Sequence, residues 1–326
     1  MKKFIVITSI FEPTEAVKKF AELSDYKLIV VGDKKTPDNW QYSNVVYLSI
    51  DAQLAMESKL AQSLPYNHYC RKMMGYIYSH REAGDIIIDT DDDNIPTDSW
   101  AFPEFEGTFD MIPANKGFFN IYDYFTDQKI WPRGLPLHLI NADTDTNDLI
   151  KSQTKVGIWQ GLADEDPDVD AIYRLTSDVP CVFKKRTPIV LGENSLAPFN
   201  TQNTAIVKEL FPLLYLPCHV TFRFTDILRG TIAQPILWSA GFSLGFTDAT
   251  VIQKRNPHDY FKDFVSEIPM YLNNEKAAQI AQKISLAQNS VADNLYNVYQ
   301  ELEKNQIVIP EEIKLLEAWL EDISIR

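Results

Sequence analysis

Short apolar runs alternate with amphipathic stretches along the first hundred residues. Runs of β-branched and aliphatic side chains predict four buried strands, at residues 4–8, 28–31, 45–50 and 86–88. Apolar residues at three- and four-residue spacing predict a helix beginning at Pro13 and another over residues 66–81, which ends at Gly84. An alternation of strands and helices is typical of a doubly wound, mostly parallel sheet.

The remainder of the chain is less regular and then becomes helical. Strands are expected at residues 156–159, 188–191 and 220–224, and a helix at 226–241 despite Pro235. From residue 273 onward the apolar spacing predicts helices over 275–302 and 311–320. We expect this last segment to pack on the rest of the chain or on a second copy of it. In the second case the protein is a homo-oligomer.

Composition narrows the function classes. The 326 residues carry a formal net charge of −14, with 45% hydrophobic and 23% charged residues, which fits a folded globular protein. An acidic chain does not favour nucleic acid as its main partner. No run is long and apolar enough for a membrane span, which leaves peripheral membrane association open. Three widely spaced cysteines without a CxxC pair predict a reduced, cytoplasmic protein.

The strongest local signal is the string I-I-I-D-T-D-D-D-N, residues 86–94. Asp89, Asp91, Asp92 and Asp93 place four carboxylates within five residues, directly after an apolar strand. Such carboxylates repel one another and raise one another's pKa values unless a cation neutralises them. Oxygen ligands favour Mg²⁺ or Mn²⁺, and open α/β sheets bind ligands at the carboxyl ends of their strands. A metal site is therefore favoured over a solvated acidic loop.

Three kinds of site compete for this string. An EF-hand loop needs Gly and Glu where Asn94 and Trp100 stand, so it fails. A haloacid-dehalogenase-type phosphatase needs Thr or Val where Asp93 stands and normally begins at the first strand. A nucleotide-sugar glycosyltransferase of the GT-A type uses an Asp-x-Asp after a mid-sheet strand, where a metal bridges carboxylate and donor diphosphate. Asp91 to Asp93 fit this third motif.

Other polar residues are expected at the same edge of the sheet. Thr8 and Ser9 end the first strand, and Asp33 ends the second, where a base or ribose is held. Arg71 and Lys72 lie on the helix before the acidic strand, within reach of diphosphate oxygens. We expect these residues, with Asp91 and Asp92, to bind the nucleotide-sugar donor.

Several blocks in the same order resemble the STELLO-like family of glycosyltransferases. They are P-T-E-A-V-K-K-F-A at 13–21, V-V-G-D-K-K-T-P at 30–37, R-K-M-M-G-Y at 71–76, the acidic string, Q-G-L-A-D-E-D-P-D-V-D-A-I-Y-R-L at 160–175, P-F-N-T-Q-N-T at 198–204, and V-T-F-R-F-T-D-I-L-R-G-T-I-A-Q at 220–234. The resemblance spans roughly residues 3 to 265 and is more specific than any single motif. Plant UDP-arabinopyranose mutases are similar more distantly.

The resemblance implies a fold, a donor and a cofactor. The fold is α/β, with a GT-A-type mixed, mostly parallel sheet flanked by helices over residues 1–268 and a C-terminal helical extension over 269–326. The donor is a nucleotide sugar, the acceptor a glycan or polysaccharide, and the cofactor Mn²⁺ or Mg²⁺. Asp91 and Asp93 are the expected metal ligands. Family members carry a His near residues 250–253, and His258 is the candidate here.

The resemblance also suggests residues for the chemistry. Asp226 stands where inverting GT-A enzymes place the base that takes the acceptor's proton, although it could equally cap a helix. Asp168 and Asp170 fall in a family block and could hold hydroxyl groups of donor or acceptor, or begin a helix after Pro167. Arg174, Arg223 and Arg229 could compensate donor charge or form ordinary ion pairs, a choice that the sequence leaves open.

We therefore expect a metal-dependent, inverting glycosyltransferase in polysaccharide synthesis. Two alternatives from other classes are a non-catalytic nucleotide-sugar-binding scaffold and a nucleotide-sugar mutase. A third is a hydrolase, because G-F-S-L-G around Ser243 matches a nucleophile elbow. That elbow needs a strand before the serine and a helix after it, whereas the pattern here predicts the reverse.

Overall fold

The computed structural model describes residues 1–326 except 143, 145–147, 178, 256–257, 286–288 and 325–326. Within the described residues the main sheet has ten strands, in the order β3-β2-β1-β4-β11-β8-β6-β9-β12-β5. Its strands are β1 Lys3–Thr8, β2 Lys27–Val31, β3 Val45–Leu48, β4 Ile86–Thr90, β5 Asn94–Pro96, β6 Glu106–Ile112, β8 Ile150–Asp164, β9 Ile189–Leu191, β11 Asn203–Val207 and β12 Ser243–Gln253. A second, two-stranded sheet pairs β7 Gly117–Phe118 with β10 Ser195–Leu196.

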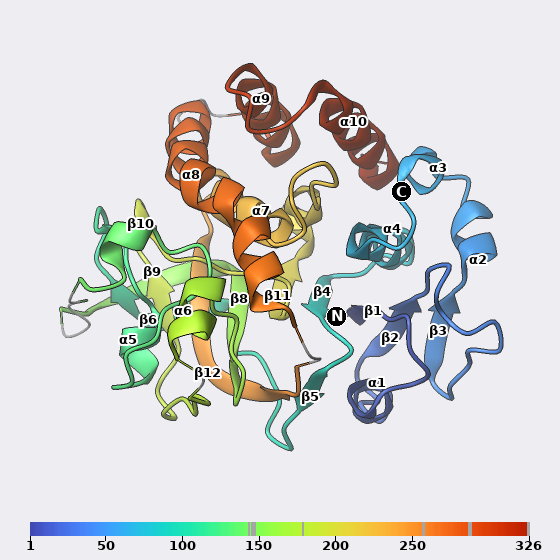
Figure 1. Cartoon of the computed structure of the whole chain (residues 1–326), viewed down its shortest axis with the longest axis horizontal. Coiled ribbons are helices and arrows are strands. Elements are labelled where there is room, and N and C mark those ends of the chain that lie inside the picture. Colours follow the sequence, from blue (N-terminus) through green and yellow to red (C-terminus); the bar gives the residue numbers. More distant parts are fainter. Residues whose placement is uncertain (143, 145–147, 178, 256–257, 286–288, 325–326) are drawn as a thin grey trace.

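Helices cover the sheet, as Figure 1 shows. The α-helices are α1 Glu15–Phe20, α2 Ile50–Leu54, α3 Lys59–Ser63, α4 Met73–Arg81, α5 Tyr122–Phe125, α6 Ala171–Thr176, α7 Thr225–Ser239, α8 Tyr260–Ser285, α9 Val291–Lys304 and α10 Pro310–Ser324. Short 3₁₀ helices occupy η1 Tyr69–Lys72, η2 Leu137–Leu139 and η3 Lys208–Leu214. The expected α/β class, a mixed sheet flanked by helices, is confirmed.

The N-terminal half of the sheet is parallel. β3, β2, β1 and β4 pair in parallel, so β1, β2 and β4 end at the same edge. Helix α4 lies directly on these strands because Gly75 faces them without a side chain. A Cβ atom at Gly75 would lie 2.4 Å from a methyl group of Val6 and 2.9 Å from one of Val31. This close approach fixes α4, and the η1 turn before it, beneath the edge where the acidic string emerges.

The second half of the sheet is mixed. β11 runs antiparallel between β4 and β8, and β12 pairs in parallel with β8 and antiparallel with β5 and β9. In the β5–β12 pair Asn94 lies opposite Gln253. The end of β12 is thereby brought beside the acidic string that follows β4, although about 160 residues separate them.

The C-terminal helices pack against the rest of the chain. α8 lies against α7 and α6, α9 against α7 and α8, and α10 against α3 and α9 (Figure 1). Asp322 on α10 is buried and accepts hydrogen bonds from the Ser58 hydroxyl at 2.6 Å and the Leu60 backbone N–H at 3.2 Å. Helix α8 runs through residues 268 and 269, where we placed a domain boundary. Among the described residues, no helix is both long and apolar enough to cross a bilayer.

Three sequence-based expectations differ from the structure. The helix expected over residues 275–302 is divided, because α8 ends at Ser285 and α9 begins at Val291, with Asn289 and Ser290 outside both. Residues 220–224 form turns rather than a strand, and their side chains and backbone bond to Ser266 on α8 instead of to a neighbouring strand. The helix expected over residues 66–81 begins as the 3₁₀ turn η1 and becomes α-helical only at Met73. The sequence also predicts a solvated loop for the acidic stretch 141–148, and part of that stretch lies outside the described residues.

Candidate active site

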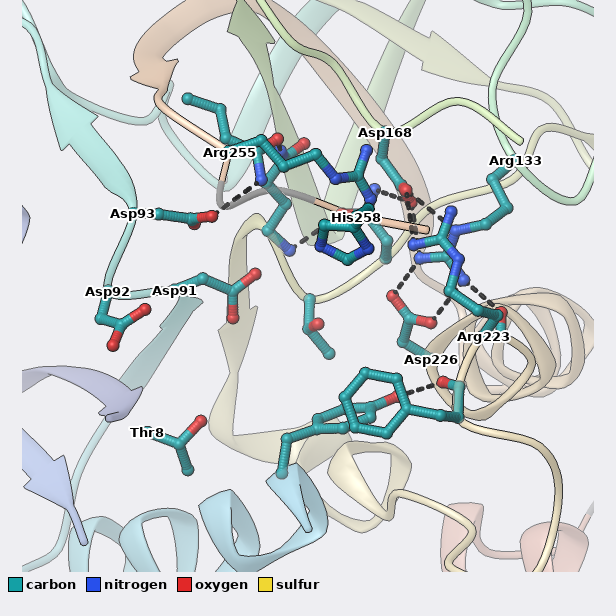
Figure 2. Close-up of a pocket in the computed structure, with 16 residues that line it drawn as sticks. Thr8, Asp91, Asp92, Asp93, Arg133, Asp168, Arg223, Asp226, Arg255 and His258 are labelled. Carbon is teal, nitrogen blue, oxygen red and sulfur yellow. Dashed lines mark hydrogen bonds and ion pairs between the residues drawn. The ribbon is translucent and has the colours of Figure 1, made fainter. Parts of the chain in front are cut away.

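Polar and charged side chains surround a cavity of about 220 Å³ at the edge where β1 and β4 end (Figure 2). Its walls come from segments far apart in the sequence. The lining residues are Thr8, Tyr69, Asp91, Asp92, Asp93, Arg133, Asp168, Asn200, Thr201, Gln202, Phe222, Arg223, Asp226, Gln253, Arg255 and His258. Asp91, Asp92 and Asp93 lie on one side and Asp168 and Asp226 on the other, so the space between them is bounded by carboxylates at both ends.

The acidic loop is held in place by bonds to neighbouring elements. The Ser9 hydroxyl, just after β1, donates to Asp92 Oδ2 at 2.5 Å, and Thr14 donates to the Asp92 backbone carbonyl at 2.6 Å. Gln253 at the end of β12 donates from Nε2 to Asp93 Oδ2 at 3.3 Å. The loop is therefore fixed between the end of β1 and the end of β12.

Two buried cations neutralise part of the acidic string. Lys72 Nζ lies 2.9 Å from Asp89 Oδ1 and 2.8 Å from Asp91 Oδ1, and Arg229 lies 2.9 Å from Asp89 Oδ2. Asp89 is fully buried and belongs to the interior rather than to the cavity. Four carboxylates against two cations leave a formal surplus of two negative charges, which matches the charge of one divalent cation.

The carboxyl groups of this loop have raised pKa values. Burial raises the pKa of Asp91 and the pKa of Asp92 to about 6 each, and it also raises the pKa of Asp93. The ammonium group of Lys72 opposes the shift at Asp91, and the neighbouring Asp93 adds to it. Burial makes the ionised form of these carboxylates less favourable. A metal ion bound to them would stabilise that form.

The donor set fits a hard divalent cation. Asp93 Oδ1 is buried and has no hydrogen-bond partner, and such a buried oxygen is costly to leave unpaired. Among the described residues, no three His, Cys, Asp or Glu side chains converge closely enough to enclose a metal ion. Mg²⁺-type sites commonly use one or two carboxylates and complete the shell with substrate phosphates and water.

The opposite wall is a buried ion-pair network centred on Arg133. Its guanidinium donates to both carboxylate oxygens of Asp168, each at 2.8 Å, and to those of Asp226 at 2.9 and 2.8 Å. Asn200 also donates to Asp168, at 2.8 Å. Burial on its own would raise the pKa of Asp168, but Arg133 and then Arg223 outweigh it and lower that pKa to about 2. Asp168 is therefore ionised throughout the physiological range.

Two arginines and a histidine also line the cavity. Arg223 is paired with the buried Glu267 on α8 at 2.8 Å. Arg255 follows β12, and its buried Nε has no hydrogen-bond partner. Burial, followed by the nearby Arg223, lowers the pKa of Arg255. His258 is hydrogen-bonded through Nδ1 to Asp263 Oδ2 at 3.0 Å, which leaves Nε2 for other partners.

A second cavity of about 260 Å³ adjoins the first at the ends of β1 and β2. Thr8, Tyr69, Asp92 and Phe222 line both cavities. Asp33 accepts hydrogen bonds from the backbone N–H groups of Lys34 and His68, at 2.7 and 3.1 Å. Ser9, Asp33 and Arg71 line this second cavity alone, and the buried Nη2 of Arg71 has no hydrogen-bond partner.

Comparison with known proteins shows which glycosyltransferases the chain resembles. Residues 223–325 match the family model of STELLO glycosyltransferases. Two proteins of Arabidopsis thaliana, each named a probable glycosyltransferase, align over 99% of this chain: STELLO2 is 26% identical over 351 residues and STELLO1 is 24% identical over 344 residues. The resemblance to the STELLO glycosyltransferases is confirmed. The chain spans 44% of the length of both of these curated relatives.

Two solved structures are distantly similar. A mycobacterial protein has a TM-score of 0.40 and 12% identity, covering 87% of this chain and 74% of its own. Glucosyl-3-phosphoglycerate synthase from Mycobacterium tuberculosis, solved with Mn²⁺ and UDP-glucose, has a TM-score of 0.41 and 14% identity, covering 84% and 78%.

The structure brings most of the expected site residues together. The first cavity holds Thr8, Asp91, Asp92, Asp93, Asp168, Asp226 and His258, and the second holds Ser9, Asp33 and Arg71. Lys72 differs from expectation. It is fully buried against Asp89, Asp91 and the Thr90 carbonyl. Its positive charge therefore offsets these two carboxylates inside the protein and does not reach diphosphate oxygens.

The remaining candidates have structural partners. Asp170 caps α6 by accepting from the Tyr173 N–H at 2.8 Å, which confirms the helix-start interpretation for this residue. Arg229 is buried against Asp89, and Arg174 is paired with Asp166. A helix precedes Ser243 and a strand begins at it, so the nucleophile-elbow geometry is absent there.

Sequence reasoning missed Arg133, Arg255 and Gln253. Arg133 stands in the irregular region between β7 and β8, where no periodicity or motif marks it. Gln253 ends β12 and Arg255 follows it, and the pairing of β12 with β5 is a contact that only the sheet topology reveals. The carboxylates at 168 and 226 were the available signal, because a buried carboxylate needs a cation.

Proposed function

We propose that this chain is a metal-dependent glycosyltransferase of the GT-A type, which transfers a sugar from a nucleotide-sugar donor to a glycan or polysaccharide acceptor. The observation that carries the proposal is the acidic loop after β4, which borders two joined cavities at the carboxyl ends of parallel strands. The naming of both Arabidopsis relatives as probable glycosyltransferases supports it.

The two cavities suggest how the donor lies. The nucleoside occupies the second cavity, beside Asp33 at the end of β2, and Arg71 offers its unpaired Nη2 there. The diphosphate then passes Asp92, which borders both cavities, and the sugar enters the first cavity. Asp91 and Asp93 would hold Mn²⁺ or Mg²⁺, which supplies positive charge to offset the charge that develops on the leaving diphosphate.

The carboxylates on the far wall receive different roles. An inverting displacement needs a base that takes the acceptor's hydroxyl proton as the new glycosidic bond forms. Asp168, whose pKa is lowered to about 2, is a weak base and is better suited to hold a hydroxyl group. Asp226 is the proposed base, because its Oδ2 keeps a lone pair beyond the bond to Arg133, whereas Oδ1 accepts from both Arg133 and the Ile227 N–H.

Several finer points belong to the same proposal. His258 stays the candidate for a third metal ligand through its Nε2 atom. A cytoplasmic location, a role in polysaccharide synthesis and association with a second copy of the chain or a membrane surface remain predictions from the sequence.

The donor and metal are tested by substitution in the acidic loop. Asp91→Asn and Asp93→Asn should each lower the Mn²⁺-dependent affinity for a nucleoside diphosphate at least roughly tenfold, because each removes an anionic ligand of the cation. Calorimetric titrations of UDP, GDP and ADP, with Mn²⁺ and with EDTA, measure this. Asp98→Asn is the matched control, since Asp98 is exposed five residues further along and lines neither cavity. Unchanged affinity in both loop variants would contradict the proposal.

A further inference from the structure

Phe222 is an exposed aromatic side chain at the junction of the two cavities. It lines both of them, and 54% of its surface is accessible to solvent. We infer, on the basis of the function proposed above, that Phe222 forms a platform against which the sugar ring of the donor packs. The ligand class is a pyranose or furanose ring attached to a nucleoside diphosphate.

The ring of Phe222 is held in place before any ligand binds. Tyr69 packs edge-on against it, with ring centroids 4.7 Å apart and planes at 71°, and His68 lies 5.6 Å away. The Tyr69 hydroxyl donates to the Phe222 carbonyl at 3.5 Å. A positioned ring loses little conformational freedom on binding, so its contact contributes more fully to affinity.

The loop that carries Phe222 is anchored at several points. The buried Glu312 on α10 accepts from the backbone N–H groups of Cys218 and His219, at 3.0 and 2.7 Å. Thr221 donates from its hydroxyl to the Ser266 carbonyl on α8 at 2.5 Å. Residues 218–221 are thus tied to α8 and α10, which keeps the ring at the junction of the cavities.

The lining of the first cavity is complementary to a sugar. A sugar ring has a rim of hydroxyl groups and a face of C–H groups, and C–H groups pack favourably on an aromatic face. Asp168, Asp226 and Asn200 offer hydrogen-bonding groups to the rim, while Phe222 offers the aromatic face. Charged side chains on one wall and the exposed ring of Phe222 on the other suit a sugar, which has both hydroxyl and C–H surfaces. They suit a phosphate or a wholly apolar group less well.

The position in the chain favours the sugar over the base. Arg223 follows Phe222 directly, and Asp226 lies one helical turn later; both line the first cavity and not the second. The base is expected in the second cavity, on the side of Asp33. Phe222 therefore faces the part of the donor that lies beyond the diphosphate.

The test separates the sugar from the nucleotide. UDP-, GDP-, ADP- and CDP-hexoses are titrated with Mn²⁺ by calorimetry, each beside its own nucleoside diphosphate, into wild type, Phe222→Ala and Phe222→Trp. Phe222→Ala should weaken the sugar nucleotide roughly three- to tenfold and leave the nucleoside diphosphate unchanged. Phe222→Trp should retain wild-type affinity, because it keeps an aromatic face. Phe261→Ala is the control, since Phe261 is 71% exposed on α8 and lines neither cavity.

Two results would overturn the inference while leaving the proposed function intact. Equal losses for sugar nucleotide and nucleoside diphosphate would place the ring against the base. Unchanged affinities in Phe222→Ala would show that the ring contacts no part of the donor. Failure of the wild-type protein to bind any pair in the panel would instead contradict the proposed donor, and the inference would fall with it.

Discussion

At the scale of single residues, surroundings decide what each aspartate can do. Asp89 is fully buried and paired with two buried cations, whereas Asp91 and Asp92 are partly buried and their pKa values are raised to about 6. Asp168 is held ionised by Arg133, with its pKa lowered to about 2. The sequence predicts the acidic loop because its residues are contiguous after a strand. It does not predict Arg133, because that partner comes from an unpatterned segment.

The proposed base gives a prediction at this scale. Asp226→Asn should lower turnover roughly 10²-fold or more, the usual effect of losing a general base, with donor and Mn²⁺ affinities near those of wild type. Arg133 keeps both oxygens of Asp168, so the fold should survive, with the free energy of unfolding reduced by about 1–3 kcal/mol. Turnover, calorimetry and thermal unfolding on the same preparations measure the three quantities.

The comparison with Asp168→Asn makes this result specific. That variant also loosens Arg133 but removes a carboxylate that is too acidic to act as a base. It should therefore raise KM for the donor or acceptor more than it lowers kcat. Wild-type kcat in Asp226→Asn, with a large loss in Asp168→Asn, would reverse the two assignments.

At the scale of elements, the sequence predicts what is local and periodic. β1, β2, β3, β4, α1, α7 and the C-terminal helices follow from apolar spacing alone. The strands β6 and β11 are not predicted, because their pairing partners are distant in the sequence. Residues 220–224 alternate like a strand, yet they pair with no strand among the described residues and form bends and turns bonded to α8 instead.

The contact between α4 and the sheet yields a prediction about an element. Gly75→Ala should lower the free energy of unfolding by about 1–3 kcal/mol, because the added methyl overlaps Val6 and Val31. Alanine is otherwise the better helix former, so a destabilised variant indicates that packing outweighs propensity. Gly107→Ala on β6 is the control, since its nearest neighbour would be 3.4 Å away. Denaturant unfolding of both variants decides, and a stabilised Gly75→Ala would rule out the close approach.

At the scale of the whole molecule, the C-terminal helices close the fold around the site. Trp319 on α10 is fully buried and donates from its indole to the Pro212 carbonyl at 3.0 Å. Glu312, also fully buried, accepts hydrogen bonds from Tyr215, Cys218 and His219, in the segment that leads to Phe222 and then to Asp226 on α7. The extension therefore supports one wall of the cavity without lining it. Sequence periodicity predicts these helices but cannot say which wall they hold.

The pairing of His219 with Glu312 makes stability depend on pH in a defined direction. The Nδ1 atom of His219 lies 3.0 Å from Glu312 Oε2, and the hydrogen bond to that carboxylate raises the pKa of His219 despite partial burial. A histidine with a raised folded-state pKa contributes its full stabilisation below the unfolded value of about 6.5 and loses it as pH rises through the higher, folded value. The wild-type protein should thus lose this increment above neutral pH.

The variant His219→Gln isolates that increment from the other titrating groups. Asp91 and Asp92 also change protonation near pH 6, but they do so equally in wild type and variant, so the difference between the two unfolding free energies removes them. That difference should be largest at about pH 5.5 and shrink towards pH 8.5, because only a protonated His219 interacts with Glu312 as an ion pair. Chemical denaturation at five pH values between these limits provides the measurement. A difference that stays constant, or grows with pH, would mean that His219 is neutral in the folded protein and that Glu312 holds the loop through its backbone bonds alone.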